Sequence, residues 1–164
     1  MPPPLARLLH HLPDPGTPLP CPGPERARIS LAAEGGSASP ATVVQMVARR
    51  LTSRAALRLW SLERVIARWR ARKTCSTRGG DADAMAKRVA SAYRASTLIL
   101  GSHDHCLPDS LAVASQLLRY GVRAELVLGV KLDPFQAHCW VQMGDAVVND
   151  SLDATRLFTP VLVV

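Results

Sequence analysis

Several residue types that mark particular protein classes are scarce in this chain of 164 residues. Only four cysteines occur, and none forms a Cys-x-x-Cys pair, so the sequence indicates neither a disulfide framework nor a zinc ribbon. No run approaches the roughly 18 uncharged apolar residues that a membrane-spanning helix needs. The start of the chain also lacks the charged and then apolar layout of a secretory signal. We therefore expect a cytoplasmic protein with thiols available for chemistry.

Aromatic residues are equally few, with three Trp, two Tyr and two Phe. None is interleaved with basic residues in the way that base-stacking surfaces require. The net charge of +7 is concentrated in residues 1–100, which hold 16 Lys and Arg against 6 Asp and Glu, whereas residues 101–164 hold 4 against 7. Such an excess suits an acidic partner, of which nucleic acid is the less favoured. A solvated helix face explains the same charges without any partner.

Proline divides the chain into two parts. Residues 1–40 hold ten of the thirteen prolines, and proline denies the backbone regular hydrogen bonds. We predict that this segment is a disordered Pro/Gly-rich tail that is dispensable for chemistry. Residues 41–164 are predicted to form one domain, because an apolar content of 48% suffices for a core.

Hydrophobic periodicity predicts helices followed by strands within this domain. Apolar residues recur at three-to-four spacing in three segments: 41–73, which is predicted to form one or two helices, 82–99 and 106–120. The stripe predicted to face inward includes Val43, Val47, Leu51 and Leu59 in the first segment and Ile99 in the second. Beyond Gly121 the period changes to two, which predicts strands at 122–130, 138–143 and 146–150. Residues 152–164 form either a last strand or a tail docked on the sheet. The pattern indicates an α+β domain whose helical N-terminal half packs on a small antiparallel β-sheet.

Three residues in this order suggest a nucleophilic site. Cys106 begins a predicted helix, His138 begins a predicted strand, and Asp150 ends the next strand. Unpaired amides at a helix N-terminus and a nearby imidazolium lower the pKa of a thiol, which makes it a nucleophile. His138 would accept and return the proton, and a carboxylate would fix the orientation of its ring. The set predicts a cysteine protease or an acyltransferase.

The pairing of His138 with Asp150 depends on the register of the predicted hairpin. A three-residue loop at 143–145 places His138 directly opposite Asp150, whereas a two-residue loop throws the two side chains onto opposite faces. We expect the three-residue loop. Asp145 and Asp153 are the nearby carboxylates that would otherwise orient the ring.

Simpler roles exist for each of these residues. Taken singly, a helical cysteine is commonly a small core residue, and a histidine or aspartate at a strand end is commonly structural. A zinc site is a further alternative, and its ligands would be His103, His105, Cys106 and Cys139. These residues lack the paired spacings that structural zinc sites have. Because side chains alternate along a strand, Cys139 points away from the face of His138 and is expected in the core.

A series of short motifs runs through residues 100–151 and surrounds the three reactive positions. They are Cys106-Leu107, Ser110-Leu111-Ala112, Leu117-Leu118-Arg119, Gly121-Val122-Arg123-Ala124, Leu126-Val127-Leu128-Gly129-Val130, Pro134-Phe135, Ala137-His138, Trp140-Val141 and Asn149-Asp150. The series resembles the transglutaminase-like cysteine proteases that remove the leader from lasso-peptide precursors. The resemblance implies a transglutaminase-like or papain-like fold, with Cys106 as nucleophile, His138 as base and Asp150 as orienting acid.

The same resemblance implies partners. The leader would be held by a winged-helix recognition protein, which is expected to be separate here because a 40-residue Pro/Gly-rich tail is too small for it. A macrolactam synthetase would use ATP to close the ring of the product. This chain has no Gly-rich phosphate loop, and we expect it to need no cofactor or metal.

Two other functions stay open at this point. A transglutaminase or acyltransferase would use the same three residues to transfer the acyl group to an amine rather than to water. A non-catalytic adaptor would use the basic helices to bind an acidic partner, with the three residues left over from an ancestor.

Overall fold

The computed structural model describes residues 27–32, 36–74, 81–101 and 105–164. Four long or medium helices precede most of the sheet. In chain order the elements are β1 (Ile29–Ser30), α2 (Pro40–Leu59), α3 (Leu62–Thr74), α4 (Ala82–Leu100), α5 (Cys106–Arg119), β2 (Glu125–Leu132), β3 (Phe135–Met143), β4 (Ala146–Val147), α6 (Leu152–Arg156) and β5 (Thr159–Val163). The predicted helical half is confirmed, and its first segment is two helices.

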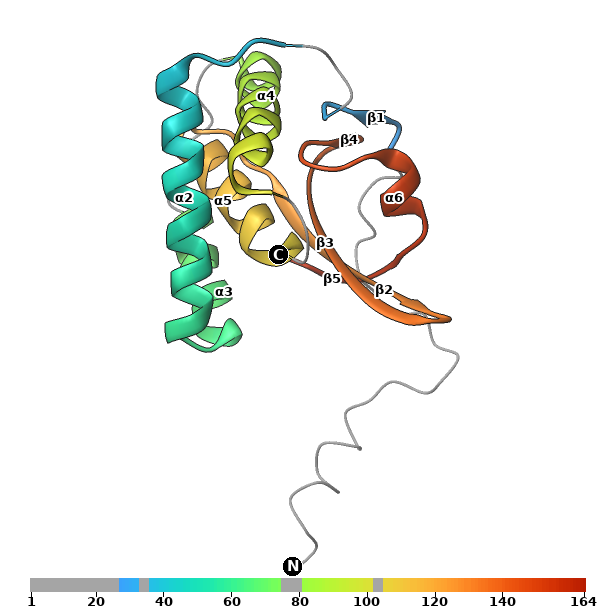
Figure 1. The fold of residues 1–164 in the computed structure, drawn as a ribbon. Coiled ribbons are helices and arrows are strands. Elements are labelled where there is room, and N and C mark those ends of the chain that lie inside the picture. The colour runs from blue at the N-terminus through green and yellow to red at the C-terminus, as the bar shows by residue number, and fades with distance from the viewer. Residues whose placement is uncertain (1–26, 33–35, 75–80, 102–104) are drawn as a thin grey trace, which may run out of the picture.

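Helix α5 lies at the centre of the molecule (Figure 1), between the other long helices and the sheet. It packs on α2 and α4 on one side and on β3 and β2 on the other. The main core fills this layer, while a smaller cluster of Val127, Trp140 and Val147 lies under Leu152 of α6 and Phe158. The first turn of α5 is therefore held from several directions.

Capping residues mark the starts of α2 and α4 and the end of α5. The side chain of Ser39 accepts a hydrogen bond from the amide of Thr42 at the start of α2, and that of Asp81 accepts one from Ala84 at the start of α4. These caps pair amides that a helix start leaves unpaired. Gly121 follows α5 with a φ of 72°, the left-handed conformation that commonly ends a helix.

The buried faces of two helices differ from the prediction. Helix α2 buries Thr42, Met46 and Arg50, one residue out of phase with the predicted apolar stripe, and Leu59 of that stripe is 75% exposed. Ile99 of α4, also predicted to face inward, is 65% exposed. The buried ion pair of Arg50, described below, holds α2 in this rotation. Hydrophobic periodicity does not predict it, because it treats arginine as a surface residue.

The five strands form a mixed sheet in the order β1-β4-β3-β2-β5. Neighbouring strands are antiparallel except β1 and β4, which are parallel. The predicted α+β architecture is confirmed, and the expectation of a purely antiparallel sheet is corrected by this pair. Residues 159–163 form the last strand, so the strand alternative for the C-terminal segment is right. Helix α6 was not expected from the sequence.

Strand β1 falls within the segment predicted to be a disordered tail. Its residues Ile29 and Ser30 pair with β4, and the next residue, Leu31, is 6% exposed and belongs to the main core. The prediction of a tail over residues 1–40 is therefore wrong for these residues. The parts of that prediction over residues 1–26 and 33–35 lie outside the described residues.

The register of the β3–β4 hairpin is not the predicted one. Gln142 lies opposite Val147, and Met143 lies opposite Ala146, so the loop holds two residues, Gly144 and Asp145. Gly144 adopts a φ of 59° in this turn, which glycine does without strain. A continued ladder in this register would place Asp150 opposite a residue other than His138.

None of the helices in the described ranges combines the length and the apolar composition that crossing a membrane requires.

Candidate active site

Cys106 is the first residue of α5, where the backbone amides have no partner within the helix. Within the described part of the chain, the side chain of His105 at the N-cap position makes no capping hydrogen bond. The amides of Leu107 and Cys139 instead donate to the thiol of Cys106. The half-buried sulfur thus lies among donors that favour its anionic form.

His138 lies within β3, three residues after Phe135 begins the strand, so the expectation that it begins a strand is wrong. Its ring lies 5.0 Å from the ring of Phe158 and 6.1 Å from that of Trp140, measured between centroids. These two rings cover the imidazole and limit its rotation. About a fifth of the His138 side chain, 22%, stays exposed to solvent.

Asp150 reaches His138 even though the hairpin register differs from the prediction. After Val147 the chain leaves the ladder in a series of bends, and Asp150 Oδ2 accepts a hydrogen bond from His138 Nε2. The other carboxylate oxygen accepts one from the amide of Ser151 at 2.7 Å. The hydroxyl of Ser30 in β1 donates to the backbone carbonyl of Asp150 at 2.6 Å. A strand from the predicted tail therefore supports this residue.

The three side chains form one electrostatic unit. The hydrogen bond to Asp150, followed by that to Cys106, raises the pKa of His138 from 6.5 to about 9. The hydrogen bond from His138 lowers the pKa of the Cys106 thiol below its ordinary value, against the opposing effect of burial. Since Nε2 faces Asp150, Nδ1 is the ring nitrogen left for the sulfur. At neutral pH this arrangement favours a thiolate and an imidazolium side by side.

A buried polar bridge holds α5 against β3 beside this unit. The hydroxyl of Ser110 donates to the carbonyl of Cys139 at 2.9 Å and accepts from Asn149 Nδ2 at 3.0 Å. Asn149 Oδ1 in turn accepts from the amide of Val141 at 2.8 Å and replaces the strand partner that β4 no longer provides. Ser110 and Asn149 stand in the motifs quoted above, but the sequence alone gave them no role.

Gly129 makes room for the aromatic wall behind His138. It lies opposite His138 in the β2–β3 ladder. A Cβ atom at Gly129 would approach both Phe158 Cβ and the Trp140 ring to 2.9 Å, which is closer than packed carbon atoms lie. Glycine at this position lets Trp140 and Phe158 pack closely enough to support the imidazole.

A second charged cluster anchors the other side of the first turn of α5. Arg50 Nε donates to Asp109 Oδ1 at 3.0 Å and Arg50 Nη2 to Asp109 Oδ2 at 2.6 Å, with both side chains buried. The same guanidinium donates to Ser96 of α4 and to the carbonyl of Gly101, where α4 ends. Arg54 Nη2 lies 3.6 Å from Asp109 Oδ1. One side chain thus links α2, α4 and α5 three residues from Cys106.

The other predicted candidates lie apart from this chemistry. Cys139 is 2% exposed in the main core, as predicted, and burial raises the pKa of its thiol to about 12. Asp145 is in the hairpin turn, where its carbonyl accepts from Arg28, and Asp153 is exposed in the first turn of α6. His103 lies outside the described residues, and in the described ranges no three His, Cys, Asp or Glu side chains form a group suited to a metal ion.

Comparison with known proteins places the chain in a family. A segment of 46 residues is 41% identical to the microcin J25-processing protein McjB of Escherichia coli and covers 28% of this chain and 22% of that relative. No solved structure matches the chain significantly. A family model described as the transglutaminase-like superfamily matches residues 41–163. The match spans most of the chain and agrees with the helical half, the sheet and the predicted fold, and the chain therefore belongs to the transglutaminase-like superfamily.

Proposed function

We propose that this chain is a cysteine peptidase that cleaves the leader from a ribosomally made lasso-peptide precursor. The observation that carries the proposal is the contact of His138 with both the Cys106 thiol and the Asp150 carboxylate. Membership of the transglutaminase-like superfamily supports thiol-based acyl chemistry. The similarity to a microcin J25-processing protein supports a lasso precursor as the substrate.

In the proposed reaction the Cys106 thiolate attacks the carbonyl carbon at the end of the leader. Backbone amides near the start of α5 stabilise the oxyanion, the C–N bond breaks, and the amine leaves with a proton from the His138 imidazolium. A thioester joins the leader to Cys106. His138 then takes a proton from water, the resulting hydroxide attacks the thioester, and the leader departs as a carboxylic acid while the thiol is restored. Asp150 keeps the imidazole oriented throughout.

The proposal includes the partners that the reaction sequence needs. A separate winged-helix protein would present the leader, and a macrolactam synthetase would use ATP to close the ring after cleavage. The peptidase itself would work without cofactor or metal, because each proton and electron pair in the steps above is supplied by its own side chains and by water.

Reconstitution tests this function. The chain is incubated with a precursor peptide and its recognition protein, and the products are weighed by mass spectrometry. We expect two fragments whose masses sum to that of the precursor plus one water. The Cys106→Ala variant is expected to give no cleavage while its circular dichroism spectrum is unchanged, and Cys139→Ala is the matched control that keeps activity. Equal loss in both folded variants would contradict the proposal.

Transfer to an amine is the second candidate, and the superfamily match is the observation that favours it. The same reaction is run with added methylamine. A leader fragment carrying the mass of the amine in place of water would identify an acyltransferase, and an unmodified leader acid would support hydrolysis. For the adaptor alternative, the test is alkylation of Cys106 by iodoacetamide at neutral pH, since an inactive relic has no need of an activated thiol.

A further inference from the structure

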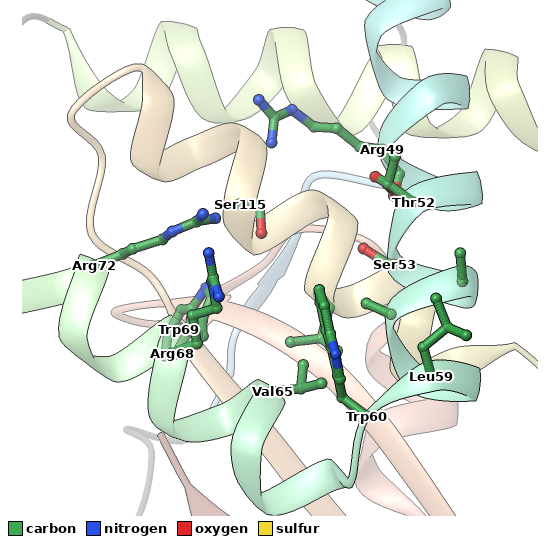
Figure 2. Close-up of a pocket in the computed structure, with 13 residues that line it drawn as sticks. Arg49, Thr52, Ser53, Leu59, Trp60, Val65, Arg68, Trp69, Arg72 and Ser115 are labelled. Carbon is green, nitrogen blue, oxygen red and sulfur yellow. Dashed lines mark hydrogen bonds between the residues drawn. The ribbon is translucent and has the colours of Figure 1, made fainter.

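A pocket of about 360 Å³ lies on the side of the helical layer formed by α2, α3 and α5. Figure 2 shows Arg49 and Arg72 reaching from α2 and α3 toward Ser115 on α5. Ser115 follows Cys106 by nine residues, which separates the two by about 14 Å along the helix. The pocket is therefore distinct from the candidate active site.

The floor of the pocket is apolar and rich in large side chains. Trp69 is buried there, and Val65 and Leu111 lie beside it. At the edge, Leu59 is 75% exposed and Trp60 is 44% exposed. Exposed large apolar residues around a hollow are typical of interaction sites. The pocket is at the small end of the range for ligand sites, roughly 300–1,000 Å³, and suits one large side chain.

Four arginines line the pocket and the hollow that adjoins it. Arg49, Arg68 and Arg72 line both the pocket and an adjoining hollow along α3 and α5, to which Arg119 also belongs. Burial and the positive charges of Arg119 and Arg72 lower the pKa of Arg49, so the guanidinium groups repel one another. Among the described residues, none of the four makes an ion pair with a carboxylate.

We infer that this groove binds an acidic peptide segment of a partner protein, with one large apolar side chain of the segment inserted in the pocket. Carboxylates of the segment would pair with Arg72 and Arg119 and relieve the repulsion at Arg49. The adjoining hollow continues past the pocket, which fits an extended chain better than a compact small molecule. Binding of this kind does not depend on the chemistry of Cys106 and goes beyond the proposed peptidase function.

The observations favour a peptide over a nucleic acid. Stacking of bases needs accessible aromatic faces. Trp69 is 4% exposed, and the guanidinium of Arg68 lies over the ring of Trp60 at 5.8 Å from its centroid. The apolar floor offers a nucleic acid little, whereas aromatic and arginine side chains are the ones enriched at protein interfaces.

The test uses the full chain with tryptophan indoles labelled by ¹⁵N and a synthetic peptide with glutamates on both sides of a single leucine. The chain has three tryptophans, and the third, Trp140, lies beside His138 and provides an internal control. We expect saturable shifts of the Trp60 and Trp69 indole signals and none of Trp140. Replacing the leucine by serine, or the glutamates by lysines, should weaken binding of the peptide.

Matched variants assign the binding to the groove. Arg72 and Arg119 are exposed, and the double variant Arg72→Gln/Arg119→Gln is expected to weaken binding about tenfold. Arg70 is an exposed arginine of α3 outside the groove, and Arg70→Gln is expected to change binding less than twofold. Leu59→Ala should weaken binding, whereas Leu98→Ala, an exposed leucine of α4, should not. Cys106→Ala should bind as the wild type does.

Several results would overturn the inference. They are an equal effect of the Arg70 and Arg72/Arg119 changes, indole shifts of Trp140 alone, and tighter binding of a single-stranded oligonucleotide at the same indoles. Self-association in analytical ultracentrifugation that Arg72→Glu abolishes would assign the groove to a second copy of the chain instead.

Discussion

Asp109 in the first turn of α5 and Asp150, which bonds to His138, are each paired with a basic side chain, and the two pairs differ in how much water reaches them. In the Arg50–Asp109 pair the side chains are 0% and 1% exposed, and in the His138–Asp150 pair they are 22% and 21% exposed. Arginine stays charged at every relevant pH, whereas the hydrogen bonds to Asp150 and Cys106 raise the pKa of His138 only to about 9, so its ring is able to give up a proton. The buried pair therefore fixes the position of the helix, and the accessible pair is suited to move protons.

The largest expected effect is on catalysis. Asp150→Asn should lower turnover by up to about 10⁴, because the imidazole loses the carboxylate that orients it and supports its charge. Asp145→Asn and Asp153→Asn should leave turnover within a few-fold, since neither contacts His138. Kinetics on the reconstituted reaction, with thermal unfolding of each variant, check this. If Asp153→Asn were inactive and Asp150→Asn active, Asp153 and not Asp150 would orient His138, and the assignment made here would be wrong.

The buried pair should show the opposite pattern, a large loss of stability. Arg50→Met leaves Asp109 charged without its main partner and should cost about 3–5 kcal/mol of unfolding free energy. Adding Asp109→Leu should recover much of that loss, because the uncompensated charge is then gone. Urea unfolding measures both variants, and Arg58→Met, an exposed arginine of the same helix, is the control. No change in stability in Arg50→Met would refute the anchoring role.

A smaller effect is expected from the wall behind His138. Gly129→Ala forces a Cβ against Trp140 and Phe158 and should cost roughly 1–3 kcal/mol through overpacking. Because those rings hold the imidazole, turnover should fall at a temperature where the variant is fully folded, and the alkaline limb of the pH profile should move. Lys131→Ala on the same strand is the control. A variant that is merely less stable, with an unchanged pH profile, would argue against the positioning role.

The smallest effect is expected at Ser30, which holds the backbone of Asp150 from β1. Ser30→Ala should lower turnover several-fold, in keeping with the loss of one hydrogen bond of about 1 kcal/mol. Deleting residues 1–37 removes the whole strand and should cost more, contrary to the sequence-based expectation that the tail is dispensable. The activities of Ser30→Ala and of the deletion variant are measured beside Ser37→Ala, an exposed serine that serves as the control. Full activity of the deletion variant would support the expectation that the tail is dispensable.

The sequence predicted which three side chains meet better than it predicted the surrounding frame. Cys106, His138 and Asp150 were chosen for residue type, order and helix position, and the structure brings them into contact; their catalytic role stays a prediction. The predicted three-residue loop, from which the pairing of His138 with Asp150 was argued, was wrong. The two residues meet because the short β3–β4 ladder ends before Asp150 and the chain then bends toward His138. The side chain of Asn149 accepts the hydrogen bond that the amide of Val141 would otherwise give to a strand neighbour. The length of the loop does not predict a side chain in this role.

Long-range polar contacts are the part that the sequence could not supply. Arg50 is one of four arginines in α2, and what distinguishes it is its pair of buried hydrogen bonds to Asp109, 59 residues away. The parallel pairing of β1 with β4 joins residues more than a hundred positions apart, and its two residues are too few for a periodicity. Contacts of this kind arise from packing and not from local propensity.

The activated thiol is the central claim, and its reactivity tests that claim without any substrate. The rate of Cys106 alkylation by iodoacetamide is measured against pH in the wild type, in His138→Ala and in Asp150→Asn. We expect an inflection below the ordinary thiol pKa of 9.0 in the wild type, a shift back toward that value in His138→Ala, and a smaller shift in Asp150→Asn. An inflection that is the same in all three proteins would contradict the claim.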